Sequence, residues 1–176
     1  MYKNPLPKYV GGWSNTVSYG GFTLDMLFTY QAGFSVYYGT DAGLHDQRVW
    51  NNSTDMLTGS AWLKAGDAGK RWARPVFNDN VSNGSAMPID VNVFKGDFIK
   101  LRNVTLSYSM PSSIMQRIGF ASARFYVSGQ NLAIFSKYPG PDPEVSSNGN
   151  TTTSQGVDRN TSPNARTITV GVNVGL

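Results

Sequence analysis

The sequence predicts an all-β protein, an antiparallel meander of about five long strands. Five segments alternate apolar and polar side chains with period two, which is typical of strands that have one apolar and one polar face. The connections between these segments alternate between short and long. Charged residues make up only 15% of the 176 residues, against about 25% in typical soluble domains, and Asn, Ser, Thr and Gly fill the difference.

The first two strands are predicted near residues 12–19 and 22–31, and they form a hairpin. Gly20 and Gly21 stand between them. Two glycines that both accept positive φ favour a two-residue turn. The second strand has the clearest alternation in the chain, because every second residue from 22 to 30 is large and apolar.

A third strand is predicted near residues 97–109 and a fourth near 123–132. Lys100 and Arg102 fall on the apolar parity of the third strand. Either they lie beyond the apolar layer or a β-bulge changes the register at this point. The connection between the two strands is predicted to form one or two helical turns over residues 112–119.

The fifth strand is predicted near residues 166–176. From residue 168 onward its even-numbered residues are apolar, whereas its odd-numbered residues from 167 onward are small or polar. The apolar ones are Ile168, Val170, Val172, Val174 and Leu176. Both a soluble β-sandwich and an outer-membrane barrel contain strands of this kind, so this strand alone leaves both architectures open.

The two long connections, near residues 33–96 and 133–165, fall at one end of the meander, and the short ones fall at the other. Outer-membrane barrels have this asymmetry, with short periplasmic turns and long extracellular loops. The smallest such barrels have about eight strands, and an open sheet edge in lipid leaves costly unpaired backbone groups. We therefore expect the chain to be a transmembrane segment of a larger barrel. The first and last strands of this segment are expected to pair with strands that are absent from this chain.

The composition argues against several other classes of protein. The net charge of +4 comes from scattered basic residues, so nucleic-acid binding is not expected. The chain has no cysteine, and His45 is its only histidine. We therefore predict no catalytic site, no metal site and no cofactor. No secretory signal follows Met1, so an exported chain of this kind is expected to be incomplete.

Candidate contact residues lie in the two long loops. Trp50, Trp62 and Trp72 could stack on sugars or anchor a partner protein; alternatively they pack the loop on itself. Asp142 and Glu144, held between prolines, could bind a cation or sugar hydroxyls; alternatively they form a rigid loop corner that faces water.

Two charged residues lie on the polar parity of the strands. Asp25 and Arg124 could line a substrate path. The alternative is that they are solvated or paired residues of the wall, and this is the interpretation we favour.

Several segments resemble, in order and spacing, the SusC/RagA-type TonB-dependent outer-membrane transporters. They lie at residues 5–13, 97–111, 124–132, 138–144 and 163–176. The third runs from Arg124 through Gly-Gln-Asn to Leu132, and the fourth contains Asp-Pro-Glu at 142–144, preceded by Tyr138, a further candidate contact. The chain is similar to the C-terminal part of such a transporter.

This resemblance implies a barrel of about 22 strands with an N-terminal plug. It implies import of glycans or peptides across the outer membrane of Bacteroidetes-type bacteria. The implied partners are the rest of the barrel and the plug, a SusD-like surface lipoprotein, the TonB complex through the missing part, and outer-membrane lipid. The plug itself is absent from the chain.

The resemblance also implies that the last strand carries the barrel's assembly signal. The corresponding positions are Thr169, Gly171, Val174 and Leu176. Such barrels usually end on an aromatic residue, whereas this chain ends on an aliphatic one. The rival hypotheses are a secreted, soluble β-sandwich that binds carbohydrate, and a truncated fragment without independent activity.

Overall fold

The computed structural model describes residues 4–44, 59–72, 74, 89–147, 151 and 155–176. The chain folds into two compact units. The sheet unit comprises Pro7–Ala32, Asp97–Lys137 and Pro163–Leu176. The loop unit comprises Met1–Leu6, Gly33–Gly96 and Tyr138–Ser162.

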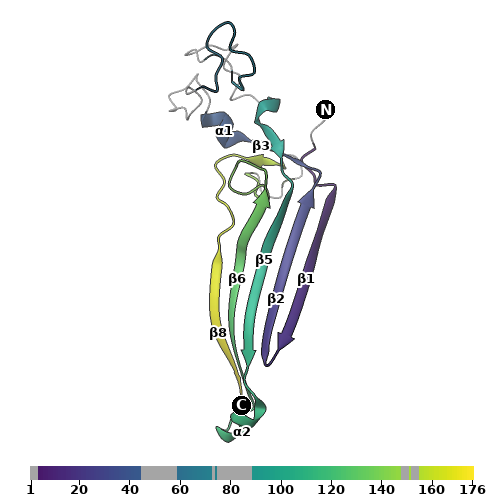
Figure 1. Ribbon diagram of the computed structural model, residues 1–176, viewed down its shortest axis with the longest axis vertical. Helices are drawn as coiled ribbons and strands as arrows, with labels where there is room; N and C mark the ends of the chain where they lie inside the picture. The colour runs from purple at the N-terminus through teal and green to yellow at the C-terminus, as the bar shows by residue number, and fades with distance from the viewer. Residues whose placement is uncertain (1–3, 45–58, 73, 75–88, 148–150, 152–154) are drawn as a thin grey trace. The chain divides into compact units, whose positions relative to one another are not determined.

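The sheet unit is a five-stranded antiparallel meander (Figure 1). Its strands are β1 (Tyr9–Tyr19), β2 (Phe22–Ala32), β5 (Phe98–Ser109), β6 (Ser122–Ser136) and β8 (Thr167–Gly175). They lie side by side in the order β1-β2-β5-β6-β8, each hydrogen-bonded to its neighbours in the chain's order. The predicted fold class, an all-β antiparallel meander of about five long strands, is confirmed.

The β1–β2 hairpin turns at Gly20 and Gly21, whose φ angles are 57° and 86°. Both values are positive, as the two-residue turn requires. The hairpin is longer than expected, because pairing continues to Tyr9 opposite Ala32 and does not stop at residue 12. The extra residues Tyr9, Val10 and Gly11 precede a second glycine, Gly12, and glycine has low strand propensity, so the sequence pattern did not mark the start of this strand.

A β-bulge at Arg102 keeps the faces of β5 separate. Leu27 pairs with Asn103 and Phe28 pairs with Leu101, so Arg102 is skipped. The bulge moves Lys100 onto the polar face, opposite Thr29. Of the two explanations for the charges on the apolar parity, the bulge is the correct one.

Strand β6 continues four residues past its expected end at residue 132. Asn131 has a φ of 53°, and neither it nor Leu132 has a partner in the β5 register. Pairing resumes at Ala133, opposite Leu101, and ends at Ser136, opposite Phe98. The two-residue interruption resembles a strand end in the sequence, although the strand continues beyond it.

Cross-strand pairing arranges the apolar side chains in rows that run across the sheet. The row nearest the Gly20–Gly21 turn contains Tyr19, Phe22, Tyr108, Phe125 and Val172. The next row contains Val17, Leu24, Leu106, Val127 and Val170. Towards the opposite end, a third row contains Gly11, Tyr30, Ile99 and Phe135. Between the second and third rows lie a row with Met26, Val104 and Ile168 and a row with Trp13, Phe28 and Leu101. Aromatic residues therefore lie at both ends of the apolar face and also within it.

This apolar face is uncovered. Trp13 is 59% exposed, Phe125 50% and Ile168 74%. Within the face, aromatic side chains contact each other across strands. The rings of Trp13 and Phe28 stack with centroids 5.5 Å apart, and those of Phe22 and Tyr108 lie 4.6 Å apart.

The loop unit contains a small three-stranded sheet. Its strands are β3 (Ser35–Tyr38), β4 (Val93–Lys95) and β7 (Val157–Asp158), in the order β4-β3-β7. Strand β3 pairs antiparallel with β4 and parallel with β7. The helix α1 (Gly39–Leu44) and the 3-10 turn η3 (Asp90–Asn92) accompany it. Strands this short have no readable period, so this order within the expected loops was not predicted.

The connection between β5 and β6 contains the helix α2 (Ser112–Arg117), as expected. Gly119 follows it with a φ of 80°, which suits the position just after a helix end. Among the residues that the structure describes, none of the helices has both the length and the apolar character to cross a membrane.

The pair Tyr126–Gly171 leads to a testable prediction about the sheet. A Cβ at Gly171 would lie 2.4 Å from the Tyr126 ring, so Gly171→Ala forces that ring to move. We expect a loss of about 1–3 kcal/mol of stability, measured as a lower thermal midpoint of the sheet signal in circular dichroism. In a Tyr126→Ala background the same change should cost much less; equal costs in both backgrounds contradict the explanation.

Candidate functional site

Part of the polar face of the sheet carries short uncharged side chains that are hydrogen-bonded to each other. Asn103, Thr105 and Ser128 form a closed set. The Asn103 amide donates to Thr105 Oγ1 at 3.2 Å, Thr105 donates to Ser128 Oγ at 2.9 Å, and Ser128 donates to Asn103 Oδ1 at 3.2 Å. This set orders the surface without placing a formal charge on it.

The two charged residues of this face that the sequence singled out are both hydrogen-bonded across strands. Thr16 Oγ1 donates to Asp25 Oδ1 at 2.6 Å. Arg124 Nη2 donates to Ser107 Oγ at 2.8 Å, and Ser107 is almost fully buried. These bonds are those expected of paired wall residues, and they hold both charged groups against the sheet.

The four proposed assembly positions lie on or directly after β8. Thr169 pairs with Ser128 on the polar face, and Gly171 lies beneath the Tyr126 ring. Val174 is 52% exposed on the apolar side, and Leu176 is 97% exposed. A receptor that reads this strand therefore finds its apolar groups accessible.

The loop unit has an aromatic centre that joins three of its segments. The Tyr138 ring lies 5.4 Å from Tyr38 and 6.3 Å from Phe94, measured between centroids. The Tyr138 hydroxyl donates to Asp158 Oδ2 at 2.7 Å, and Thr161 donates to the other carboxylate oxygen. Burial raises the pKa of Tyr138 well above its ordinary value, and the hydrogen bond to Asp158 raises it further.

Arg71 connects the segment 59–72 to the rest of the loop unit. Its guanidinium carbon lies 4.8 Å from the centroid of the Trp72 ring and 4.9 Å from that of Phe94. It also pairs with Asp41 Oδ2 at 3.3 Å and donates to the Val91 carbonyl at 3.2 Å. One planar cation thus contacts three segments, which suits arginine better than lysine.

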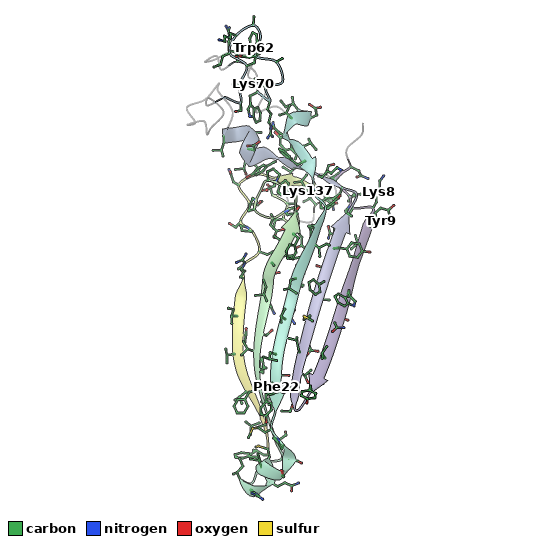
Figure 2. The ribbon with its side chains drawn as sticks, viewed as in Figure 1. Lys8, Tyr9, Phe22, Trp62, Lys70 and Lys137 are labelled. Carbon is green, nitrogen blue, oxygen red and sulfur yellow. The ribbon has the colours of Figure 1, made fainter. Side chains whose placement is uncertain are left out.

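The three candidate tryptophans occupy different situations. Trp72 is 7% exposed and packs with Ala61 and Val91. Trp62, ten residues earlier, is 42% exposed beside an exposed Leu63; Figure 2 shows it on the same segment as Lys70. Trp50 lies outside the described residues, as does His45.

The segment that carries Trp62 is internally braced. The Trp62 N–H donates to the Trp72 carbonyl at 2.9 Å, and the Leu63 and Lys64 N–H groups both donate to Asp67 Oδ2 at 3.1 Å. Lys70 Nζ donates to the Gly59 carbonyl. A ring presented on such a braced segment loses little conformational freedom when it binds.

The Asp142–Glu144 corner is organised by its own backbone. Asp142 is 3% exposed, and its Oδ1 accepts a hydrogen bond from the Glu144 N–H at 3.0 Å. A carboxylate that closes its own turn in this way stabilises the loop corner. In the part of the chain that the structure describes, no group of three or more His, Cys, Asp or Glu side chains could hold a metal ion.

Sequence reasoning did not identify Arg71, Asp158 or Tyr126 as organising residues. Arg71 and Asp158 contact residues that lie 20 to 30 positions away in the chain, so no local pattern marks them. Tyr126 gave a weak signal, because it is a large ring on the polar parity of its strand. Its direct partner on the neighbouring terminal strand is a glycine, Gly171.

Comparison with known proteins finds relatives over almost the whole chain. The TonB-dependent receptor P39 of Formosa agariphila is 33% identical over 97% of this chain. The receptor P3 of the same organism is 29% identical, and the TonB-dependent receptor SusC of Bacteroides thetaiotaomicron is 27% identical over 99% of the chain. Over nearly its whole length the chain is therefore similar to TonB-dependent receptors, among them SusC. It spans 16% of the length of each of these relatives.

Solved structures agree with this family in fold. The RagAB peptide importer in its closed-closed state matches 100% of this chain and 18% of the matched chain, with a TM-score of 0.79 at 23% identity. The RagAB open-open state gives a TM-score of 0.77. No family model matches the chain. The meander therefore has the fold of the matched part of the RagAB importer.

The different burial of Trp62 and Trp72 predicts different effects of removing them from the full-length receptor. Trp72→Ala should destabilise the loop unit by about 3–5 kcal/mol, because a buried ring leaves a cavity. Trp62→Ala, the matched control, should change stability by less than about 0.5 kcal/mol. Hydrogen exchange of the amides in segment 59–72 measures both, and similar loss of protection in the two variants contradicts this assignment.

The raised pKa of Tyr138 predicts a loss of loop-unit stability at high pH. In the unfolded chain Tyr138 ionises near its ordinary pKa of about 10, whereas the folded group stays protonated. Its contribution is therefore complete below about pH 10 and falls by about 1.4 kcal/mol per pH unit above that. Tyr138→Phe should lower stability at neutral pH and remove this part of the slope, as hydrogen exchange between pH 9 and 11 can measure.

Proposed function

We propose that this chain is the C-terminal part of the barrel wall of a TonB-dependent nutrient importer in the outer membrane. In this role it supplies five wall strands, two long extracellular loops and the strand on which barrel assembly ends. The protein's activity is transport and not catalysis.

The exposed apolar face, which has aromatic residues at both of its ends, is the observation that carries this proposal. From Phe22 to Tyr30 the strand β2 advances eight residues, or about 27 Å at about 3.4 Å per residue of an antiparallel strand. A strand tilt of about 40° reduces this to about 20 Å along the membrane normal, close to the apolar band of outer-membrane barrels. Aromatic girdles flank that band in such barrels.

Charged side chains flank the sheet beyond the row that contains Tyr30 and Phe135. Figure 2 shows Phe22 at one end of the sheet and Tyr9, Lys8 and Lys137 at the other. Lys8 and Lys137 directly flank β1 and β6, so their ammonium groups fall where lipid headgroups and water begin. This transition supports a membrane boundary at the level of the row that contains Tyr30 and Phe135.

The opposite face supports a watery lumen. Its hydroxyl and amide groups form hydrogen-bonded sets, and its charged residues Asp25 and Arg124 are bonded across strands. A soluble β-sandwich would instead bury the apolar face against a second sheet. Here the residues of that face are exposed, which favours the membrane alternative.

The two edges of the sheet, β1 and β8, support pairing with further strands of the receptor. Unpaired backbone groups cost several kcal/mol each in lipid, so both edges need partners there. Thr169, Gly171, Val174 and Leu176 are proposed as the positions recognised during assembly. Their accessibility on the outermost strand suits recognition before the barrel closes.

The finer proposal concerns partner and cargo. We propose that a SusD-like surface lipoprotein covers the receptor and that the cargo is a glycan or a peptide; the relatives include SusC and the RagAB peptide importer. Among the candidate contacts Trp50, Trp62, Trp72, Tyr138, Asp142 and Glu144, we favour Trp62. It presents an exposed ring on a braced segment, whereas Trp72, Tyr138 and Asp142 are buried.

The proposal is tested with the full-length receptor in its own outer membrane. We expect heat-modifiable migration on gels, which folded barrels show, and loss of growth on one defined nutrient class when the gene is deleted. Growth on purified oligosaccharides and on peptides, compared between the deleted and complemented strains, separates the two cargo classes. Trp62→Ala should weaken uptake at unchanged receptor level. Lys64→Ala is the control on the same segment, because the Lys64 side chain is exposed and its backbone bond to Asp67 is kept.

A soluble, monomeric receptor that needs no detergent would contradict the membrane role. Unchanged growth of the deleted strain on both nutrient classes would contradict the import role. Unchanged uptake by the Trp62→Ala receptor would remove Trp62 from the contact surface and leave the rest of the proposal in place.

A further inference from the structure

We infer that the connection between β5 and β6, residues 110–121, is a membrane anchor. Its helix α2 lies in the headgroup region of the phospholipid leaflet at the short-turn end of the barrel, with Ile114 and Ile118 among the acyl chains. This inference rests on the proposed function. In addition to the lipid-facing strands, the connection 110–121 would then contact lipid.

The side chains of α2 and of Ile118, which directly follows it, divide into a buried side, an apolar exposed side and a polar side. Met115 is 3% exposed, whereas Ile114 is 45% and Ile118 58% exposed. Residues four apart share a helix face, so the two isoleucines form one apolar patch. Gln116 is two residues from each and lies about 200° around the helix from Ile114, so it faces the opposite direction.

The connection begins at the boundary that the first aromatic row marks. Tyr108 and Phe125 of that row are paired on the two strands that the connection joins. Met110 N donates to the Ala123 carbonyl at 2.9 Å, and Ala121 N donates to the Gly175 carbonyl at 2.9 Å. Both ends are thus fastened to strand ends, and Figure 1 shows α2 at the end of the sheet where β8 also finishes.

The burial of Ala123 indicates on which side the connection folds. Ala123 has the same parity as Phe125, so both belong to the apolar face of β6. Ala123 is only 8% exposed, whereas Phe125 is 50% exposed. A connection that folded over the polar face would leave Ala123 as open as its neighbour. The difference therefore favours coverage of the apolar, lipid-facing side at this end.

The charge of the connection fits a phospholipid surface. Residues 110–121 contain one charged residue, Arg117, and no acid. Arg117 is exposed in the last turn of α2. A short amphipathic helix with an apolar patch and a basic residue is suited to the interface of a leaflet that contains anionic lipid.

The test places nitroxide labels on single cysteines in a cysteine-free full-length receptor, reconstituted in vesicles of phosphatidylethanolamine and phosphatidylglycerol. The variants are Ile114→Cys and Ile118→Cys, with Gln116→Cys as the matched control on the same helix and Val170→Cys as a control on β8. Heat-modifiable migration verifies that each variant is folded. Collision rates with oxygen and with a polar nickel chelate are then compared.

We expect the labels at 114 and 118 to collide more with oxygen than with the chelate, at a shallower depth than the label at 170. The label at 116 should show the reverse preference. If the label at 170 lies in hydrocarbon while the labels at 114 and 118 are as accessible to water as the label at 116, the membrane-anchor inference is contradicted and the proposed barrel role is not. Labels at 114 and 118 shielded from both reagents would indicate a protein contact and also overturn the anchor. A water-accessible label at 170 contradicts the proposed function itself.

Discussion

The alternation of side chains along each strand is the constraint on which the sheet unit depends. Successive residues of a strand point to opposite faces, so one residue out of step exchanges every later side chain between the two faces. The sheet has an apolar face with aromatic rows and a polar face with hydrogen-bonded hydroxyl and amide groups. Each strand must keep its parity for both faces to exist.

The bulge at Arg102 shows how the protein maintains this parity. Between Leu101 and Asn103 the register advances by one extra residue, so Leu101 stays with the apolar row while Lys100 joins the polar face. Without the bulge, the ammonium group of Lys100 would lie among apolar side chains, a costly position for a charge. The neighbouring strand accommodates the shift by its own interruption at Asn131 and Leu132.

These features also explain how much the sequence could predict. Period two and the Gly20–Gly21 pair are local signals, and they predicted the five strands and the hairpin. The bulge was foreseen only as one of two alternatives, because the parity conflict at Lys100 has no unique local solution. The end of β6 was missed, because the interruption at Asn131 and Leu132 looks like a strand end in the sequence. The small sheet of the loop unit was missed, because its strands have only two to four residues.

For the tryptophans, the sequence could not distinguish the buried ring of Trp72 from the exposed ring of Trp62, because burial depends on distant partners such as Val91.

The two units differ in what stabilises them, and this difference bears on function. The sheet unit is stabilised by a continuous ladder of backbone hydrogen bonds, which tolerates many side chains provided that polarity alternates. The loop unit depends instead on a few side-chain contacts of long sequence separation, among them Arg71 with Asp41 and Phe94, and Tyr138 with Asp158. Changes between these anchoring residues, at exposed positions such as Trp62, alter the surface without removing a stabilising contact. A receptor built in this way can change what its loops bind while its wall strands keep the same register.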